Sequence, residues 1–234
     1  VFFGCTQKST KRAEDNSSKD SLASYFVLAN DLSLPIPKRQ DYNRKALDIV
    51  VNQENDSLNR VNLFKVANRY YNLSDWNAFS ATVRLVLEKS ERALDTASAA
   101  KAYTYLGDYY ESQAVSDSAF LYYFKAEKMY DKLGDSFSLA KTHINKANLQ
   151  YRASDFLGSE KAVFNALRVI KGKKQANNIL YDAYNLLGLI YNELGEYENA
   201  MTYHNKALKV IDDEFLPVEF QSKATSYNNI GFLY

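Results

Sequence analysis

Small residues recur along the 234-residue chain at nearly constant intervals of 40, 40, 41 and 43 positions. Gly188 lies in the segment YNLLGLIY, whose other residues favour a helix. A glycine inside a helix costs about 1 kcal/mol relative to alanine, so its presence indicates a packing requirement. Small side chains let two helices approach to about 8–10 Å. The recurrence therefore predicts a series of helix hairpins that pack closely at these positions: Ala67, Gly107, Ala147, Gly188 and Gly231.

Large residues recur in register with the small ones. Around Gly107 the chain reads AYTYLGDYY and then SAFLYYFKAEKMY, and around Gly188 it reads AYNLLGLIY and then NAMTYHNKALKVI. Residues three or four positions apart share one face of a helix, so the tyrosines and leucines fill the space between hairpins. Ala200 follows Gly188 by twelve positions in a second helix. We expect Gly188 and Ala200 to contact each other.

This pattern resembles the tetratricopeptide repeat (TPR), which combines an aromatic residue, Leu-Gly and Tyr with a later alanine, aromatic residue and alanine. The matching residues are Tyr103, Leu106, Gly107, Tyr110, Ala119, Tyr123 and Ala126, and then Tyr184, Leu187, Gly188, Tyr191, Ala200 and Ala207. His204 replaces the second aromatic residue of the later repeat. The resemblance implies an all-α fold, a right-handed α-solenoid of TPR-like hairpins with extended repeats of about 40 residues.

The solenoid is predicted to occupy residues 20–234, truncated at its C-terminal end. The hairpins are expected at about 21–51, 57–92, 96–132, 136–171 and 175–213, followed by an unpaired helix at 217–234. Residues 6–19 are polar and mixed in charge, which predicts a flexible tether. Residues 1–5, VFFGC, are interpreted as the remnant of a signal sequence.

Composition and motifs argue against several functions for this segment. The 29 basic and 28 acidic residues give a formal net charge of +1, without the basic excess that binding to nucleic acid requires. No glycine-rich nucleotide motif, HExxH or CxxC occurs, so we expect no cofactor and no metal. His143 and His204 fall at or near core positions of different hairpins. We identify no catalytic residues.

The resemblance implies that a protein or peptide ligand binds in a concave groove lined by the first helix of each hairpin. Asparagine amides would pair with the ligand backbone, and tyrosines would add apolar contact. Family members that grip a C-terminal carboxylate carry lysine at a position occupied here by Phe64, Thr104, Ile144 and Asn185, which disfavours that ligand. The candidate groove residues are Asn68, Lys101, Asp108, Lys141, Asn145, Asn148, Tyr151, Arg152, Asn185 and Asn192.

The segment FFGC resembles a bacterial lipobox, in which a small residue precedes a lipid-modified cysteine. Gly4 and Cys5 match this pattern, and Phe2 replaces the usual leucine. A diacylated or triacylated Cys5 would anchor the chain to a membrane. The alternative is a free thiol at the end of an apolar segment.

Three functional hypotheses follow. In the first, the segment is the extracytoplasmic input domain of a bacterial membrane signalling protein, either a sensor histidine kinase or a TPR-containing transcription regulator, with a membrane span downstream. This hypothesis rests on fold analogy, and the catalytic parts would lie beyond Tyr234. In the second, the segment is an envelope lipoprotein scaffold in the periplasm. In the third, it belongs to a cytoplasmic adaptor.

Overall fold

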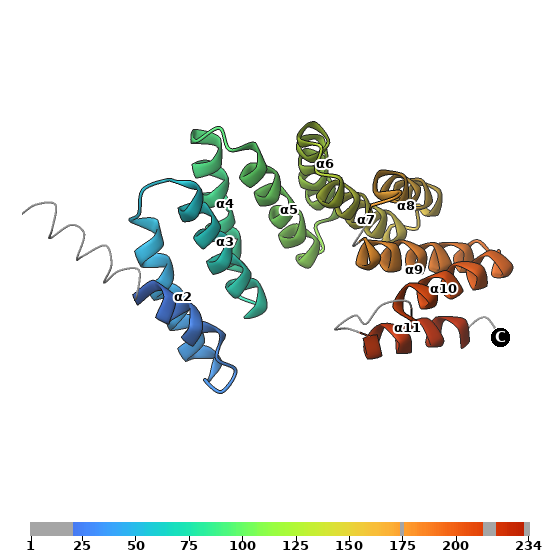
Figure 1. Ribbon diagram of the computed structural model, residues 1–234, viewed down its shortest axis with the longest axis horizontal. Coiled ribbons are helices and arrows are strands. Elements are labelled where there is room, and N and C mark those ends of the chain that lie inside the picture. Colours follow the sequence, from blue (N-terminus) through green and yellow to red (C-terminus); the bar gives the residue numbers. More distant parts are fainter. Residues whose placement is uncertain (1–20, 174–175, 213–218, 232–234) are drawn as a thin grey trace, which may run out of the picture. The chain divides into compact units, whose positions relative to one another are not determined.

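The fold is all-α, as predicted. The computed structural model describes residues 21–173, 176–212 and 219–231, and no strand occurs in these ranges (Figure 1). Residues 21–30 form the first helix. The following helices are α2 (Ile36–Val51), α3 (Ser57–Asn72), α4 (Trp76–Arg92), α5 (Thr96–Ser112), α6 (Ser116–Leu133), α7 (Ser136–Arg152), α8 (Phe156–Ile170), α9 (Asn177–Glu193), α10 (Tyr197–Asp212) and α11 (Glu219–Gly231).

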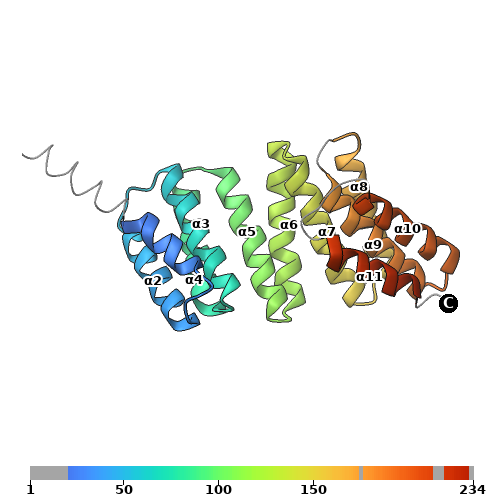
Figure 2. The ribbon, with the colours of Figure 1, turned by 60° about the horizontal axis from the view of Figure 1, so that its bottom comes forward.

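The helices divide into two compact units. The first comprises Val1–Tyr109 and the second comprises Tyr110–Tyr234, so the boundary falls within α5. In the first unit, α3 packs against both α2 and α4. In the second unit, α7 packs against α8 and α9 against α10 as antiparallel hairpins (Figure 2). α7 also contacts α9, which places the first helices of two successive hairpins side by side.

The turns between helices recur with one geometry. A residue with a left-handed backbone, with φ between 53° and 67°, appears every 20 residues from position 74 to position 154. The amide of the next residue donates to a carbonyl five positions earlier, as in Asp75 to Tyr70 (2.9 Å) and Asp135 to Tyr130 (3.1 Å). This bond satisfies a carbonyl at the helix end in the manner of a Schellman motif. The left-handed residues are Ser74, Leu94, Ala114, Gly134 and Ser154.

An aspartate follows most of these turns and begins the next helix. The side chain of Asp75 accepts a hydrogen bond from the amide of Ala78 (3.2 Å), and Asp135 does the same with Ser138 (3.1 Å). An N-cap carboxylate satisfies a free amide of the first turn and interacts favourably with the helix dipole. Helix, turn and cap together therefore occupy twenty residues, and two such blocks give the forty-residue repeat.

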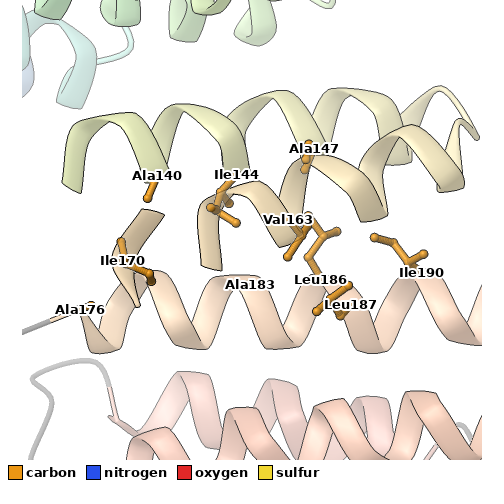
Figure 3. Close-up of a cluster of buried hydrophobic side chains, with 12 residues drawn as sticks. Ala140, Ile144, Ala147, Val163, Ile170, Ala176, Ala183, Leu186, Leu187 and Ile190 are labelled. Atoms are coloured by element: carbon orange, nitrogen blue, oxygen red, sulfur yellow. The ribbon is translucent and has the colours of Figure 1, made fainter. Parts of the chain in front are cut away.

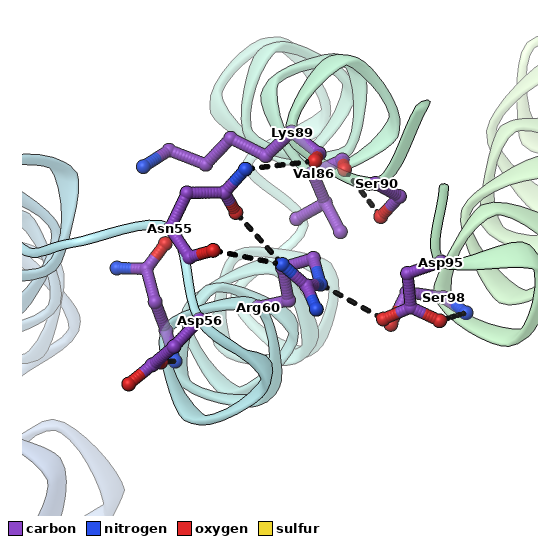
Figure 4. A network of polar contacts seen from close by, with 9 residues as sticks. Asn55, Asp56, Arg60, Val86, Lys89, Ser90, Asp95 and Ser98 are labelled. Atoms are coloured by element: carbon purple, nitrogen blue, oxygen red, sulfur yellow. Dashed lines mark hydrogen bonds and ion pairs between the residues drawn. The ribbon is translucent and has the colours of Figure 1, made fainter. Parts of the chain in front are cut away.

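The first unit buries polar groups together with its apolar core. Arg60 of α3 is 7% exposed and donates three hydrogen bonds (Figure 4). Its Nε donates to Asp95 (2.8 Å), and its Nη1 donates to the backbone oxygen (3.1 Å) and side-chain oxygen (2.9 Å) of Asn55. Asn55 in turn donates to the carbonyl of Lys89 (2.9 Å). The network links the loop before α3, the end of α4 and the turn before α5.

The second unit has a continuous apolar core between α7, α8 and α9 (Figure 3). Ala147 of α7, Val163 of α8 and Leu187 of α9 are completely buried within it. Burial of a Val or Leu side chain contributes about 1.5–3 kcal/mol, which holds the two hairpins together. A smaller cluster contains Ala119, Tyr123 and Leu149.

The recurring small residues lie at helix contacts in most of the predicted places. Ala67 and Ala147 are 0% exposed, and Gly107 is buried in α5. Gly188 is also buried, but the atoms nearest to it belong to His204 rather than Ala200. Gly231 differs from the prediction, because a Cβ added there would meet no heavy atom within 4 Å.

Candidate functional site

The first helices of the second unit are joined by contacts between residues 41 to 44 positions apart. Arg152 of α7 forms an ion pair with Glu111 at the end of α5 (2.9 Å). The Tyr151 hydroxyl donates to Glu193 of α9 (3.3 Å). Asn229 of α11 donates its amide to the side-chain oxygen of Asn185 in α9 (2.9 Å). We call the side of α7, α9 and α11 that carries these contacts the first-helix face.

Three predicted amides on this face have no intramolecular partner among the described residues. Asn145 and Asn148 lie on one side of α7, and Asn192 lies near the end of α9. All three are partly exposed, and none of their side chains forms a hydrogen bond within the described chain. Each amide therefore offers both donor and acceptor atoms to a ligand. The amide of Asn185 is already paired with Asn229.

Unlike the three asparagines, the charged and aromatic candidates Arg152 and Tyr151 form contacts with other residues of the chain. Glu111 pairs with Arg152 and also accepts a hydrogen bond from the buried Tyr123 (2.8 Å), which fixes the carboxylate. Burial, together with the charge of Glu193, raises the pKa of Tyr151 above its ordinary value. Tyr151 is therefore a neutral donor at physiological pH. Lys141 is exposed in the first turns of α7.

One position of the implied groove does not line a surface. Ile144 is 4% exposed and belongs to the apolar core between α7, α8 and α9. Its isoleucine side chain packs between hairpins because no polar atom favours contact with water. The available face of α7 is consequently narrower than the repeat pattern implied.

In the first unit, three predicted residues lie on α3 and α5. The ammonium of Lys101 lies over the rings of Phe64 (4.5 Å) and Tyr105 (5.6 Å). This desolvation lowers the pKa of Lys101. Asn68 is exposed, and Asp108 is partly exposed. The aromatic platform beneath Lys101 was not predicted, because its two rings come from different helices.

The two histidines are core residues. His204 is 1% exposed, and burial lowers its pKa. His143 is 8% exposed and lies 4.0 Å from Glu127, whose carboxylate also pairs with Lys146. Burial is the main cause of the lowered pKa of His143. Within the described ranges, no three histidine, cysteine or acidic side chains are grouped as metal ligands.

The predicted lipidation site, Cys5, lies outside the described residues, as do the predicted signal remnant at 1–5 and tether at 6–19. Among the helices that the structure describes, none combines the length and the apolar character of a membrane span.

Comparisons with known proteins agree with the helical repeat. Residues 181–213, a range that includes most of α9 and all of α10, match the family described as Tetratricopeptide repeat. A comparison with curated proteins gave no match.

Two solved structures show the same fold. The crystal structure of BtubC (BKLC) from P. vanneervenii is 17% identical, with a TM-score of 0.66 over 94% of this chain and 81% of that chain. The crystal structure of MamA protein is also 17% identical, with a TM-score of 0.54 over 83% of this chain and 93% of that chain.

The fold and the matched repeat define an α-solenoid of TPR-like hairpins. Solenoids of this class carry extended surfaces made by successive repeats, and the fold generally serves binding of proteins or peptides.

Proposed function

We propose that the chain is a binding scaffold whose second unit takes an extended protein segment on its first-helix face. The observation that carries the proposal is the alignment of α7, α9 and α11 by cross-helix contacts, beside amides that have no partner of their own. These contacts hold the helices in place before a ligand arrives. A preorganised surface loses less entropy on binding than a mobile one.

The chemistry of the face favours a peptide backbone as ligand. Asn145 and Asn148 are separated by one helical turn, and Asn192 lies on the neighbouring first helix. An asparagine amide can donate to a backbone carbonyl and accept from a backbone amide at the same time. Tyr151 adds an aromatic surface that contacts Phe156 at a ring distance of 5.8 Å. An extended segment that crosses α7 and α9 would meet all these groups.

The proposal can be tested with peptides selected from a random displayed library against the whole chain. Their affinity is then measured by fluorescence anisotropy for the parent and for Asn148→Ala combined with Asn192→Ala, which removes two of the amides that have no partner. We expect binding to weaken about tenfold or more, since each lost hydrogen bond contributes about 0.5–1.5 kcal/mol. Asn205→Ala, an exposed asparagine on α10, is the matched control and should bind normally.

Circular dichroism should show the same helicity for all three proteins. Unchanged affinity in the double variant would exclude this face as the binding surface. Equal loss in Asn205→Ala would mean that the ligand contacts the second helices instead.

For the whole protein, we propose that this scaffold is the extracytoplasmic input domain of a bacterial membrane signalling protein, such as a sensor histidine kinase. The resemblance of FFGC to a lipobox and the polar segment that follows it support an exported, membrane-associated chain. The same features suit an envelope lipoprotein scaffold. A cytoplasmic adaptor is the remaining alternative.

Labelling of the full-length protein in bacterial cells with a fatty-acid probe tests the anchor. We expect label on the parent and none on Cys5→Ser. An unlabelled parent would exclude lipidation and remove the support for the lipoprotein alternative. A downstream membrane span in the labelled protein would favour the signalling protein over the lipoprotein scaffold.

A further inference from the structure

A second buried arginine of α3 contrasts with Arg60. Arg69 is 9% exposed, almost as deeply buried as Arg60 at 7%. Its Nε has no hydrogen-bond partner, and no carboxylate of the described residues forms an ion pair with it. Arg60, nine residues earlier on the same helix, has three hydrogen bonds that include a carboxylate. The same helix thus holds one guanidinium that is paired with a carboxylate and one that is not.

The surroundings of Arg69 are cationic. Asn43 of α2 donates to the carbonyl of Val66 in α3 (3.1 Å), so Arg39, one turn before Asn43, lies level with Arg69, one turn after Val66. Burial and, to a smaller extent, the charge of Arg39 lower the pKa of Arg69. The Nε of Arg39 donates to the carbonyl of Ala29 in the last turn of the first helix (3.4 Å). Among the described residues, Arg39 has no ion pair either. The like charges of the two arginines therefore disfavour each other, and no ion pair with a described residue offsets this.

The nearest acidic group does not neutralise this pair. The carboxylate of Asp31 accepts hydrogen bonds from the amide (2.9 Å) and the hydroxyl (2.6 Å) of Ser33. These bonds are the main cause of its lowered pKa, and the charge of Arg39 contributes less. The Nε of Arg69 is buried without an acceptor, and natural proteins pair buried charged groups. The missing partner is accordingly expected from outside the described chain.

We propose that Arg39 and Arg69 form a binding site for an oxyanion, a carboxylate or a phosphate, where the first helix, α2 and α3 meet. A guanidinium presents its donors as a planar fork that matches two oxygens of such a group. The first helix contacts α3 close to this place, because the ammonium of Lys65, one turn before Arg69, lies 5.5 Å from the centre of the Phe26 ring. The bound anion would neutralise both arginines and tie the first helix to α2 and α3.

Thermal unfolding of the whole chain, followed by the fluorescence of Trp76, tests the site. Trp76 is the one tryptophan of the sequence and belongs to the same unit as the two arginines. Sodium phosphate and sodium acetate are each compared with sodium chloride at matched ionic strength. We expect at least one oxyanion to raise the unfolding midpoint more than chloride does, since a ligand that binds the folded state stabilises it.

Two variants and a control assign the effect. Arg69→Met and Arg39→Gln should each weaken the apparent oxyanion affinity about tenfold or more, as expected for loss of a charged hydrogen bond. Arg92→Gln removes an arginine that is 75% exposed on α4 and should leave the response intact. Without oxyanion, Arg69→Met should unfold at the parent's temperature or above it, because the variant removes an unpaired buried charge.

The responses to acetate, phosphate and chloride distinguish the possible results. A response to acetate alone identifies a carboxylate site, and a response to phosphate alone identifies a phosphate site. Equal midpoints in oxyanion and chloride for the parent would overturn the proposal, as would a full response in Arg39→Gln. A large fall of the midpoint for Arg69→Met in chloride would show that the guanidinium is stabilising by itself. If Arg69→Met does not fold, Arg39→Gln decides the result.

Discussion

Gly188 of α9 lies directly against the imidazole of His204 in α10. A Cβ atom added at position 188 would stand 2.5 Å from Nδ1 and 2.6 Å from Nε2 of that ring. Both residues are buried, and His204 is 1% exposed. The glycine therefore provides the volume that the histidine ring occupies within the hairpin.

Substitution of this glycine should destabilise the second unit. Gly188→Ala forces the ring of His204 or the helix backbone to move, which typically costs about 1–3 kcal/mol. Chemical denaturation monitored by circular dichroism measures the loss. In a His204→Ala background the same substitution should cost less, because the ring is gone. An equal cost in both backgrounds would show that His204 is not the cause.

Gly231 offers a matched control for that experiment. It occupies the corresponding repeat position in α11, where an added Cβ meets nothing within 4 Å. Gly231→Ala should therefore be neutral or stabilising by up to about 1 kcal/mol, from helix propensity alone. A destabilised variant would point to contacts made by α11 beyond those described.

The buried histidines predict a dependence of stability on pH. Burial lowers the folded-state pKa of His204 below the ordinary value of about 6.5. Below about pH 6.5 the imidazole of His204 is protonated in the unfolded chain but stays neutral in the folded chain. The free energy of unfolding therefore falls as the pH drops below about 6.5. The slope contributed by one histidine cannot exceed about 1.4 kcal/mol per pH unit. Denaturant titrations at successive pH values should show it.

His204→Gln should reduce this slope by the share of one histidine. The pKa of His143 is also lowered, mainly by burial, so part of the slope should remain in that variant and disappear only when His143→Gln is added. The slope is the relevant readout, because either substitution also changes the stability at neutral pH. A slope identical to that of the parent would contradict the assignment.

Removal of the Asp95 carboxylate should leave Arg60 buried and unpaired. Breaking a buried ion pair by removing one partner costs about 3–5 kcal/mol, and we expect the lower end because Asp95 is 22% exposed. Asp95→Ala also removes a cap hydrogen bond to Ser98 (3.0 Å). Asp75→Ala is the control, since Asp75 caps α4 without an arginine partner and should cost about 1 kcal/mol. Equal losses would mean that the ion pair contributes nothing.

Glu111 makes one contact with a buried residue, Tyr123, and one with an exposed residue, Arg152, and the two contacts should differ in their contribution to stability. Glu111→Ala removes the acceptor of the Tyr123 hydroxyl, and we expect a loss of about 1–3 kcal/mol. Arg152→Ala removes only the ion pair, in which the arginine side chain is 65% exposed, and should change stability little. Equilibrium unfolding compares the two variants. A larger loss for Arg152→Ala would reverse this ranking.

Leu94 adopts a left-handed backbone that suits glycine. Its φ is 53°, and its side chain is 89% exposed. Leu94→Gly should stabilise the first unit by about 1 kcal/mol, because an L-residue pays a steric cost in this conformation. Ala93→Gly, one residue earlier at φ −89°, should bring no gain. A rise in unfolding midpoint for both variants would contradict the conformational explanation.

Much of the fold could be predicted from the sequence, because only small side chains fit where two helices pack closely and these side chains mark the repeat. Ala67, Ala147 and Gly107 are buried where small residues were expected. The three atoms nearest to a Cβ added at Gly188 all belong to His204, which the pattern did not predict, since the pattern alone does not show which residue of the second helix needs space. Gly231 was predicted as a contact by its interval, but no described atom lies against it.

Less of the candidate site could be predicted from the sequence. Positions on one helix face can be counted, and this placed Asn145, Asn148 and Asn192 among the groove candidates. Counting does not reveal contacts between helices, such as that of Tyr151 with Glu193, because they depend on how two hairpins pack. The unpaired guanidinium of Arg69 was missed for the same reason, as a lone arginine in a helix gives no signal of burial.

Because the turns recur at twenty-residue intervals from Ser74 to Ser154, a block of two helices can be removed between two equivalent turns. Excision of residues 95–134 would bring Leu94 directly before Asp135, and the new joint would have the same left-handed residue and capping aspartate as the turn it replaces. Between residues 74 and 155, removal or insertion of one forty-residue block would keep the turn geometry at the new joint. The length of such a scaffold is thus free to vary in steps of one repeat.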